Sequence, residues 1–332
     1  MNDDRAADAL ALAEAALAEA MRDGVTEAEA LVMAEDSALT RFANSEIHQN
    51  VAETNSVVNL RVVIGKRIGV ASTGRTDAEG LRRLAQNAAA IARVVEELDD
   101  WGGLPGPSQA TPVAAGYSAA TAGASPEFRA EGARAVIAAA DAAGVIAYGS
   151  FATSLESTAV ANSNGVRVAG TRTTSQLITV SMGQGGGSGY AEAAAVDAST
   201  IDAAAIGREA AKKAQATTDA VSIEPGDYPV VLEEYAVVDL LDMLGYLGFS
   251  ALAVQEERSF VEPGKRIGSD LVTIRDDGRD PAGLPLWFDY EGVAKHRVEL
   301  IPRDDAVLYQ VATELEAERK VGRASEVDSS LR

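Results

Sequence analysis

The stretch VVNLRVVIGKRIGVAST (57–73) decides the fold. Its first half mixes valine, leucine and isoleucine with Asn59 and Arg61, a pattern typical of a strand with one buried face. Gly65-Lys66 then predicts a turn into a second strand over 67–73. Shorter runs of the same kind precede it, at 28–35, 38–43 and 46–53. Such closely spaced runs predict an antiparallel meander.

Helices are expected on either side of this meander. Residues 3–22 place Leu10, Leu17 and Met21 on one helical face, and residues 77–97 repeat apolar side chains at helical spacing. A helix, a meander and a helix predict an α+β domain over 1–100.

Residues 101–125 are dense in Gly, Pro, Ala and Ser, and we interpret them as a linker or an irregular surface crossing. A middle α+β domain is predicted over 126–225, in which Asn164-Gly165 indicates a hairpin turn. The helices and strands expected there lie at 126–143, 145–151, 153–161, 166–171, 173–183 and 200–217. The last region, 226–332, is expected to contain a short buried strand at 229–233, a helix at 236–247, and strands at 270–278 and 298–302.

Composition narrows the possible functions. The 332 residues carry a net charge of −21, which repels phosphate backbones and anionic lipid, so we expect no direct nucleic-acid binding and no membrane binding. The chain has no cysteine, which excludes disulfides, thiolate nucleophiles and Cys-ligated zinc. The acidic, alanine-rich N-terminus does not read as a signal peptide, and no apolar run reaches the ~20 residues of a membrane span. We therefore expect a cytoplasmic protein.

The segment VVLEEYAVVDLLDMLGYL (230–247) resembles a segment of the TldD/PmbA (TldE) family, in which the TldD subunit carries a helical His-Glu-x-x-x-His zinc motif. In this resemblance the motif positions fall on Asp242, Met243 and Leu247. A zinc hydrolase needs imidazoles or equivalent ligands and a carboxylate that activates water. Met243 cannot act as a base and Leu247 cannot bind a metal. The chain thus resembles the metal-free PmbA/TldE half of a proteolytic pair, with no catalytic, cofactor-binding or metal-binding residue of its own.

The resemblance extends over most of residues 28–301. It rests on 42–81 in the first domain, on VANSNGV (160–166) in the middle, and on 248–278 and 288–301 in the last region. After Ile301 it is expected to fade, and the chain ends on the order of a hundred residues before its relatives usually do. The family fold implies an α+β N-terminal region followed by a β-rich, barrel-like C-terminal domain, which we expect to be incomplete here.

The same resemblance implies a function. Family members work as a TldD–TldE heterodimer in which TldD holds zinc and cleaves small or unfolded peptides, and they carry an older label as modulators of gyrase. It implies a TldD-like partner, zinc in that partner, and an interface or channel wall at Tyr246–Ser259 and Phe288–Arg297. The residues expected there are Tyr246, Phe249, Glu256, Arg258, Phe288, Asp289, Glu291, His296 and Arg297.

Several alternatives stay open at the level of sequence. Asp242, with Glu233 and Glu234, is either the remnant of a metal site or a set of acids at a solvated helix N-terminus. GQGGGSG (183–189) has the glycines of a phosphate loop but not its lysine, which favours a flexible loop.

The remaining acids near the C-terminus would suit Ca²⁺ or Mg²⁺, but their spacing favours turns. They are Asp270, Asp276, Asp277, Asp280, Asp289 and Glu291. For the whole chain the alternatives are an autonomous hydrolase that uses carboxylates and one histidine, a degenerate metallopeptidase homologue without activity, and a stand-alone binding or assembly protein.

Overall fold

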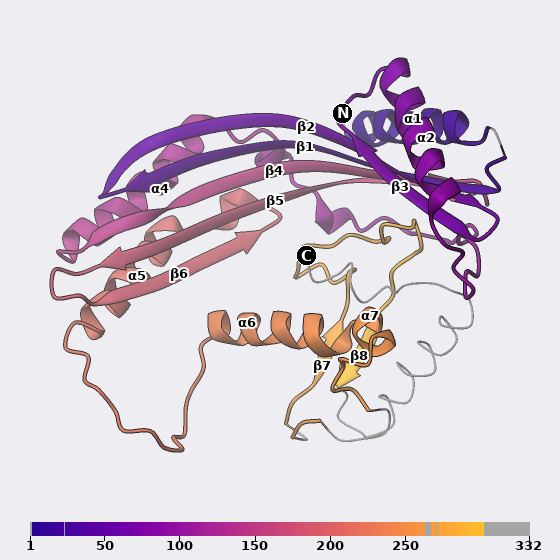
Figure 1. Ribbon diagram of the computed structural model, residues 1–332. Helices are drawn as coiled ribbons and strands as arrows, with labels where there is room; N and C mark the ends of the chain where they lie inside the picture. Colours follow the sequence, from indigo (N-terminus) through magenta and orange to yellow (C-terminus); the bar gives the residue numbers. More distant parts are fainter. Residues whose placement is uncertain (1, 23, 263–266, 270, 302–332) are drawn as a thin grey trace.

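The computed structural model describes residues 2–22, 24–262, 267–269 and 271–301. Its largest element is an antiparallel sheet of six strands with the order β3-β2-β1-β4-β5-β6 (Figure 1). The strands are β1 (Glu27–Ala43), β2 (Glu46–Ile64), β3 (Arg67–Thr73), β4 (Ile146–Asn162), β5 (Arg167–Met182) and β6 (Ser188–Ala195). Because β1 pairs with β4, one sheet runs through both the predicted N-terminal and middle domains. The α+β class is confirmed, and the domain boundaries stay predictions.

The strands are longer than the sequence pattern predicted. The runs at 28–35 and 38–43 form the single strand β1, and β2, β4 and β5 each join two predicted segments in the same way. The predicted breaks were wrong because polar residues such as Ser37 and Asn55 lie on an open face of the sheet, where they need no turn. The hairpin turn at Asn164-Gly165 is confirmed, with Gly165 at φ 98°.

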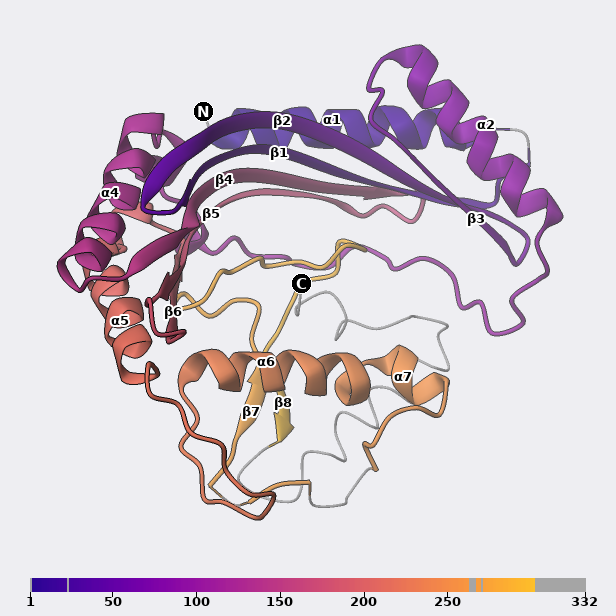
Figure 2. The same cartoon turned by 60° about the vertical axis from the view of Figure 1, so that its left-hand side comes forward.

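Helices cover the convex face of the curved sheet (Figure 2). They are α1 (Asn2–Ala20), α2 (Ala78–Val94), α4 (Pro126–Ala142) and α5 (Ala203–Ala216). The side chains of Ala28, Ala30 and Val32 are fully buried between the sheet and α1 and α2. Phe42 and Phe151 pack against α4 and α5 at the other end. Short helices η1 (Ala114–Gly116), α3 (Ala119–Ala122) and η2 (Ala198–Thr200) complete this part.

The glycine-rich stretch 183–189 is a tight connection between β5 and β6, in which the Gly183 N–H donates to the Gly187 carbonyl. A Cβ on Gly189 would lie 2.1 Å from the Ala210 carbonyl oxygen of α5. The glycines therefore let β6 pack directly against α5. This packing accounts for the glycine-rich sequence, and a phosphate-binding role is not needed to explain it.

The concave face carries segments from distant parts of the chain. Residues 101–116, which belong to the predicted linker, lie along one end of the concave face. There the Asn162 Nδ2 donates to the Pro105 carbonyl, and Val113 packs beside Trp287. The segment 285–294 covers the same end and buries Leu286, Trp287 and Phe288. The convex face thus holds helices, and irregular chain covers one end of the concave face.

The described part of the C-terminal region is mostly helical or irregular. It contains α6 (Glu234–Leu244), a π-helical turn η3 (Gly245–Phe249), α7 (Ala251–Gln255), and the short antiparallel strands β7 (Ile274–Asp276) and β8 (Val298–Ile301). Within the described residues this region is neither β-rich nor a closed barrel, contrary to the expectation. The strand predicted at 229–233 is an extended coil, since Val231 is 98% exposed and has no strand beside it. The expectations for Asp270 and for 302–332 lie outside the described residues.

Candidate functional site

The helix α6 carries the positions of the zinc motif, and its first turn is fixed to the sheet. The Tyr235 hydroxyl donates to the Glu192 carbonyl of β6, and the Tyr235 ring stacks edge-on against Tyr190 with 5.4 Å between centroids. Glu233 forms an ion pair of 2.7 Å with Lys213 of α5. These contacts set the position of α6 beside the last strand of the sheet (Figure 1).

The motif positions face open space. The side chains of Asp242, Met243 and Leu247 are all exposed, with Met243 at 54%. A thioether and an alkyl group do not supply the ligands or the base of a zinc hydrolase, so these residues do not fit a catalytic zinc ion. No group of three or more His, Cys, Asp or Glu residues that could hold a metal occurs in the described part of the chain.

The interpretation of Glu233, Glu234 and Asp242 as acids at a helix N-terminus holds for only two of the three residues. Glu233 and Glu234 do lie at the N-terminus of α6, where negative charge is favoured. Asp242 instead lies eight residues further on, before the π-helical residues 245–249, and so outside the first turn where the dipole favours acids. Among the described residues, no hydrogen bond or ion pair explains an acid at this position.

The predicted interface residues fall into a buried and an exposed group. Phe249, Phe288 and Asp289 are 4%, 0% and 5% exposed, so their side chains belong to the chain's own packing. The exposed residues are Tyr246, Glu256, Arg258, His296 and Arg297. Glu256 pairs with Arg258, and Arg297 pairs with Glu299. The described contacts do not join the two predicted segments into one patch, and their role at an interface stays a prediction.

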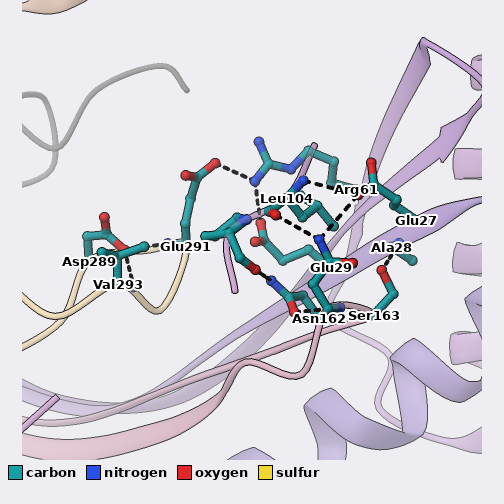
Figure 3. A network of polar contacts seen from close by, with 12 residues as sticks. Glu27, Ala28, Glu29, Arg61, Leu104, Asn162, Ser163, Asp289, Glu291 and Val293 are labelled. Atoms are coloured by element: carbon teal, nitrogen blue, oxygen red, sulfur yellow. Dashed lines mark hydrogen bonds and ion pairs between the residues drawn. The ribbon is translucent and has the colours of Figure 1, made fainter. Parts of the chain in front are cut away.

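Glu291 belongs to a charge cluster that sequence analysis missed, in which Glu29 is buried and Arg61 and Glu291 are half-buried (Figure 3). Arg61 Nη2 of β2 lies 2.7 Å from Glu29 Oε1 of β1 and 2.5 Å from Glu291 Oε1. The Arg61 guanidinium also lies 5.8 Å from the ring centre of Trp101. Asp289 shapes the turn, because its Oδ1 accepts hydrogen bonds from the N–H groups of Glu291 and Val293. The cluster ties the segment 285–294 to the concave face.

Burial gives Glu29 an unusual protonation behaviour. Its side chain is 7% exposed, and Oε2 has no hydrogen-bond partner among the described residues. Burial raises the pKa of Glu29 to about 7 although Arg61 opposes the change, and Glu291 and Asp289 add to it. Burial lowers the pKa of Arg61, but the two carboxylates outweigh it and keep the guanidinium charged. The ionised form of Glu29 therefore destabilises the folded state, and Arg61 offsets only part of this effect.

This arrangement predicts that the stability of the fold depends on pH, and that this pH dependence disappears in Glu29→Gln. The folded-state pKa of about 7 lies above the ordinary 4.5, so protonation of Glu29 stabilises the fold at low pH, and this contribution is lost as the pH rises through 7. We expect Glu29→Gln to be more stable than the wild type near pH 8, by up to about 3 kcal/mol, and to show a flatter pH dependence above pH 5. Urea unfolding measured across this range checks it. Glu97→Gln, at an exposed ion pair, is the control, and equal pH slopes in the wild type and Glu29→Gln would contradict the assignment.

The open end of the concave face forms a groove of about 500 Å³, which we call the concave groove. Alternate residues of β1, β2, β4 and β5 point into it, and Leu39, Val51 and Ala152 lie side by side on its floor. Sequence analysis did not single it out, because its residues are adjacent only through the strand register.

Comparison with known proteins assigns the chain to a family. Three domain models match in order: PmbA/TldA metallopeptidase domain 1 over residues 28–92, the central domain over 121–217, and the C-terminal domain over 225–329. The chain belongs to the PmbA/TldD metallopeptidase family. The match to 329 corrects the expectation that the resemblance fades after Ile301. Curated protein sequences give no match.

Solved structures show the same fold. TldE from Thermococcus kodakarensis aligns with a TM-score of 0.77 at 20% identity, over 91% of this chain and 70% of that one. A putative modulator of DNA gyrase from Bacteroides thetaiotaomicron gives 0.77 at 18% identity, over 91% and 73%. A putative modulator of a DNA gyrase from Thermotoga maritima gives 0.73 at 20% identity, over 87% and 68%. No helix in the described part of the PmbA/TldD-family chain is long and apolar enough to cross a membrane.

Proposed function

We propose that this chain is the metal-free, TldE-like subunit of a two-chain zinc peptidase that acts on small or unfolded peptides. The observation that carries the proposal is the exposed helix α6, whose zinc-motif positions hold Asp242, Met243 and Leu247. A member of a metallopeptidase family without ligands at these positions needs a second chain to supply zinc and base. That partner is a TldD-like subunit with His-Glu-x-x-x-His.

On this proposal the chain has no peptidase activity alone and acts in the cytoplasm. Its net charge of −21 opposes direct binding to DNA, so the gyrase-modulator names of two relatives are not carried over. The exposed part of the predicted interface, from Tyr246 to Arg258, supplies the contact with the partner.

Affinity purification of the tagged chain from its own host tests the proposal. We expect near-stoichiometric recovery of one protein with His-Glu-x-x-x-His, and zinc-dependent peptidase activity in the purified pair only. Two results would contradict the proposal. One is recovery of the folded chain without a partner. The other is peptide hydrolysis by the isolated chain that is abolished in Asp242→Asn or His296→Ala. The former result would leave a stand-alone binding protein or an inactive homologue, and the latter an autonomous hydrolase.

A matched pair of variants tests the interface. Tyr246 is 60% exposed and lies in the predicted interface, whereas Tyr228 is 52% exposed and lies outside it. Because buried aromatic residues dominate interface energies, we expect Tyr246→Asp to weaken association at least about tenfold. Tyr228→Asp is expected to leave it unchanged. Titration of the purified partner into each variant measures both, and equal affinities would exclude this face.

A further inference from the structure

The concave groove lies over β1, β2, β4 and β5, at the end of the sheet away from the segment 285–294. The pleat of the strands sends every second residue toward it. One row across the four strands consists of Val51, Leu39, Ala152 and Gln176, and its first three members are apolar. The next row is polar and consists of Ser37, Glu53, Ser154 and Thr174. The groove thus offers an apolar floor beside a line of hydrogen-bonding groups.

The dimensions suit a short extended chain. Four strands spaced by ~4.8 Å make the floor about 14 Å wide, which about five extended residues cross at ~3.3 Å each. The volume of about 500 Å³ is within the range of small-ligand sites. A peptide that crosses the strands would place its apolar side chains on the floor and its polar groups against the neighbouring row.

The charges in the groove are unbalanced. Glu53 makes no hydrogen bond or ion pair with any described residue, and Glu35 accepts only one, of 2.7 Å, from the Ser154 hydroxyl. Glu156 of β4 and Arg172 of β5 form a bidentate ion pair, so their charges neutralise each other. Arg41 is the cation at the opposite rim, where it donates to Gln49. Two carboxylates without a cation make the Glu35–Glu53 side complementary to a positively charged group.

We propose that the concave groove binds an extended peptide with a lysine or arginine side chain, which Glu35 and Glu53 recognise. The inference rests on the proposed function in taking a peptide as the ligand, and it adds a preference for basic side chains and the residues that set it. The groove is confined to this chain, so binding does not require the zinc subunit.

Fluorescence anisotropy of the purified full chain with labelled peptides tests the inference. The probes are Ala-Lys-Ala-Lys-Ala and its Gln and Glu counterparts, which share one length and backbone. We expect the Lys peptide to bind most tightly, with an affinity that falls in high salt because screening weakens exposed charge pairs. In Glu35→Gln/Glu53→Gln its affinity is expected to fall about fivefold, the effect of two exposed pairs of ~0.5 kcal/mol each.

A second double variant controls for net charge. Glu96 and Glu131 are exposed and lie outside the groove, so Glu96→Gln/Glu131→Gln changes the charge equally and is expected to bind like the wild type. Equal losses in both double variants would overturn the inference, because the attraction would come from the whole acidic chain. So would equal binding of all three peptides, or no binding of any.

The outcomes separate this inference from the proposed function. The chain could bind the Lys peptide through Glu35 and Glu53 but recover no zinc subunit from its host. That result would support the groove as a peptide site and contradict the heterodimer. Conversely, a chain that recovers its partner but binds no peptide keeps the heterodimer and rejects the groove as a peptide site. If Glu35→Gln/Glu53→Gln instead loses the partner, the concave face belongs to the subunit interface and the peptide proposal fails.

Discussion

Arg61→Met is expected to destabilise the fold by about 3–5 kcal/mol near pH 8, the usual effect of leaving a buried charge without its partner. Arg61 is the cation that lies between Glu29 and Glu291, at 2.7 and 2.5 Å. Methionine fills a similar volume but leaves the buried Glu29 and the half-buried Glu291 without a cation between them. Near pH 5 the loss should be smaller, because Glu29 is then protonated in the wild type as well. Chemical unfolding at both pH values measures it.

Two controls separate this effect from the loss of any arginine. Arg67 forms an exposed ion pair with Glu97, at 42% and 51% exposure, so Arg67→Met is expected to cost below about 1 kcal/mol. The double variant Glu29→Gln/Arg61→Met removes one of the orphaned charges and should recover part of the loss, a coupling that a double-mutant cycle isolates. If Arg61→Met and Arg67→Met lose the same stability at both pH values, the cluster does not hold the segment 285–294.

The charge cluster shows where sequence reasoning stops. Glu29 and Arg61 interrupt two apolar runs, and both runs were correctly predicted as strands. Only the register makes them direct neighbours across β1 and β2, and a one-residue slip would put them on opposite faces. The third member, Glu291, is 230 positions from Arg61, and no local pattern indicates that the two side chains meet.

The fold itself was predictable to the extent that it depends on local patterns. The hairpin at Asn164-Gly165 follows from turn chemistry, and α2 begins after Asp77, whose carboxylate accepts from the Gly80 N–H as a helix cap does. The lengths of β1 and β2 were not predictable in this way, because a sheet with an open concave face allows polar residues within a strand. The groove follows from the same property.

The residues of the candidate zinc position were found through resemblance alone. Asp242 and Met243 form no local pattern that indicates a lost metal site, and the assignment of Asp242 to a helix N-terminus was wrong, because α6 begins eight residues before it. The structure adds that this helix is exposed along most of its length and anchored at its first turn by Tyr235.

Trp287→Ala is expected to destabilise the attachment of segment 285–294 by about 3–5 kcal/mol, the range for a buried aromatic side chain. Trp287 is 6% exposed, and its ring lies so close to β5 that a Cβ on Gly170 would be 2.4 Å from Cζ2. Gly170→Ala should therefore also destabilise, by about 1–3 kcal/mol through overpacking. Leu284→Ala, at a neighbouring position that is 43% exposed, is the control and is expected to change stability by less than about 0.5 kcal/mol.

Hydrogen exchange shows whether the loss is local. The Lys295 N–H donates to the Trp287 carbonyl, and the Asp289 N–H donates to the Val293 carbonyl, so both amides should exchange faster in Trp287→Ala while β1 stays protected. Because Trp287 and Arg61 hold the same segment, Arg61→Met combined with Trp287→Ala should cost less than the sum of the two single changes. Once the segment is released, Glu291 reaches water and only Glu29 is left orphaned. Strict additivity would mean that the aromatic contact and the charge cluster hold separate parts of the chain, and the segment 285–294 would then not be one unit.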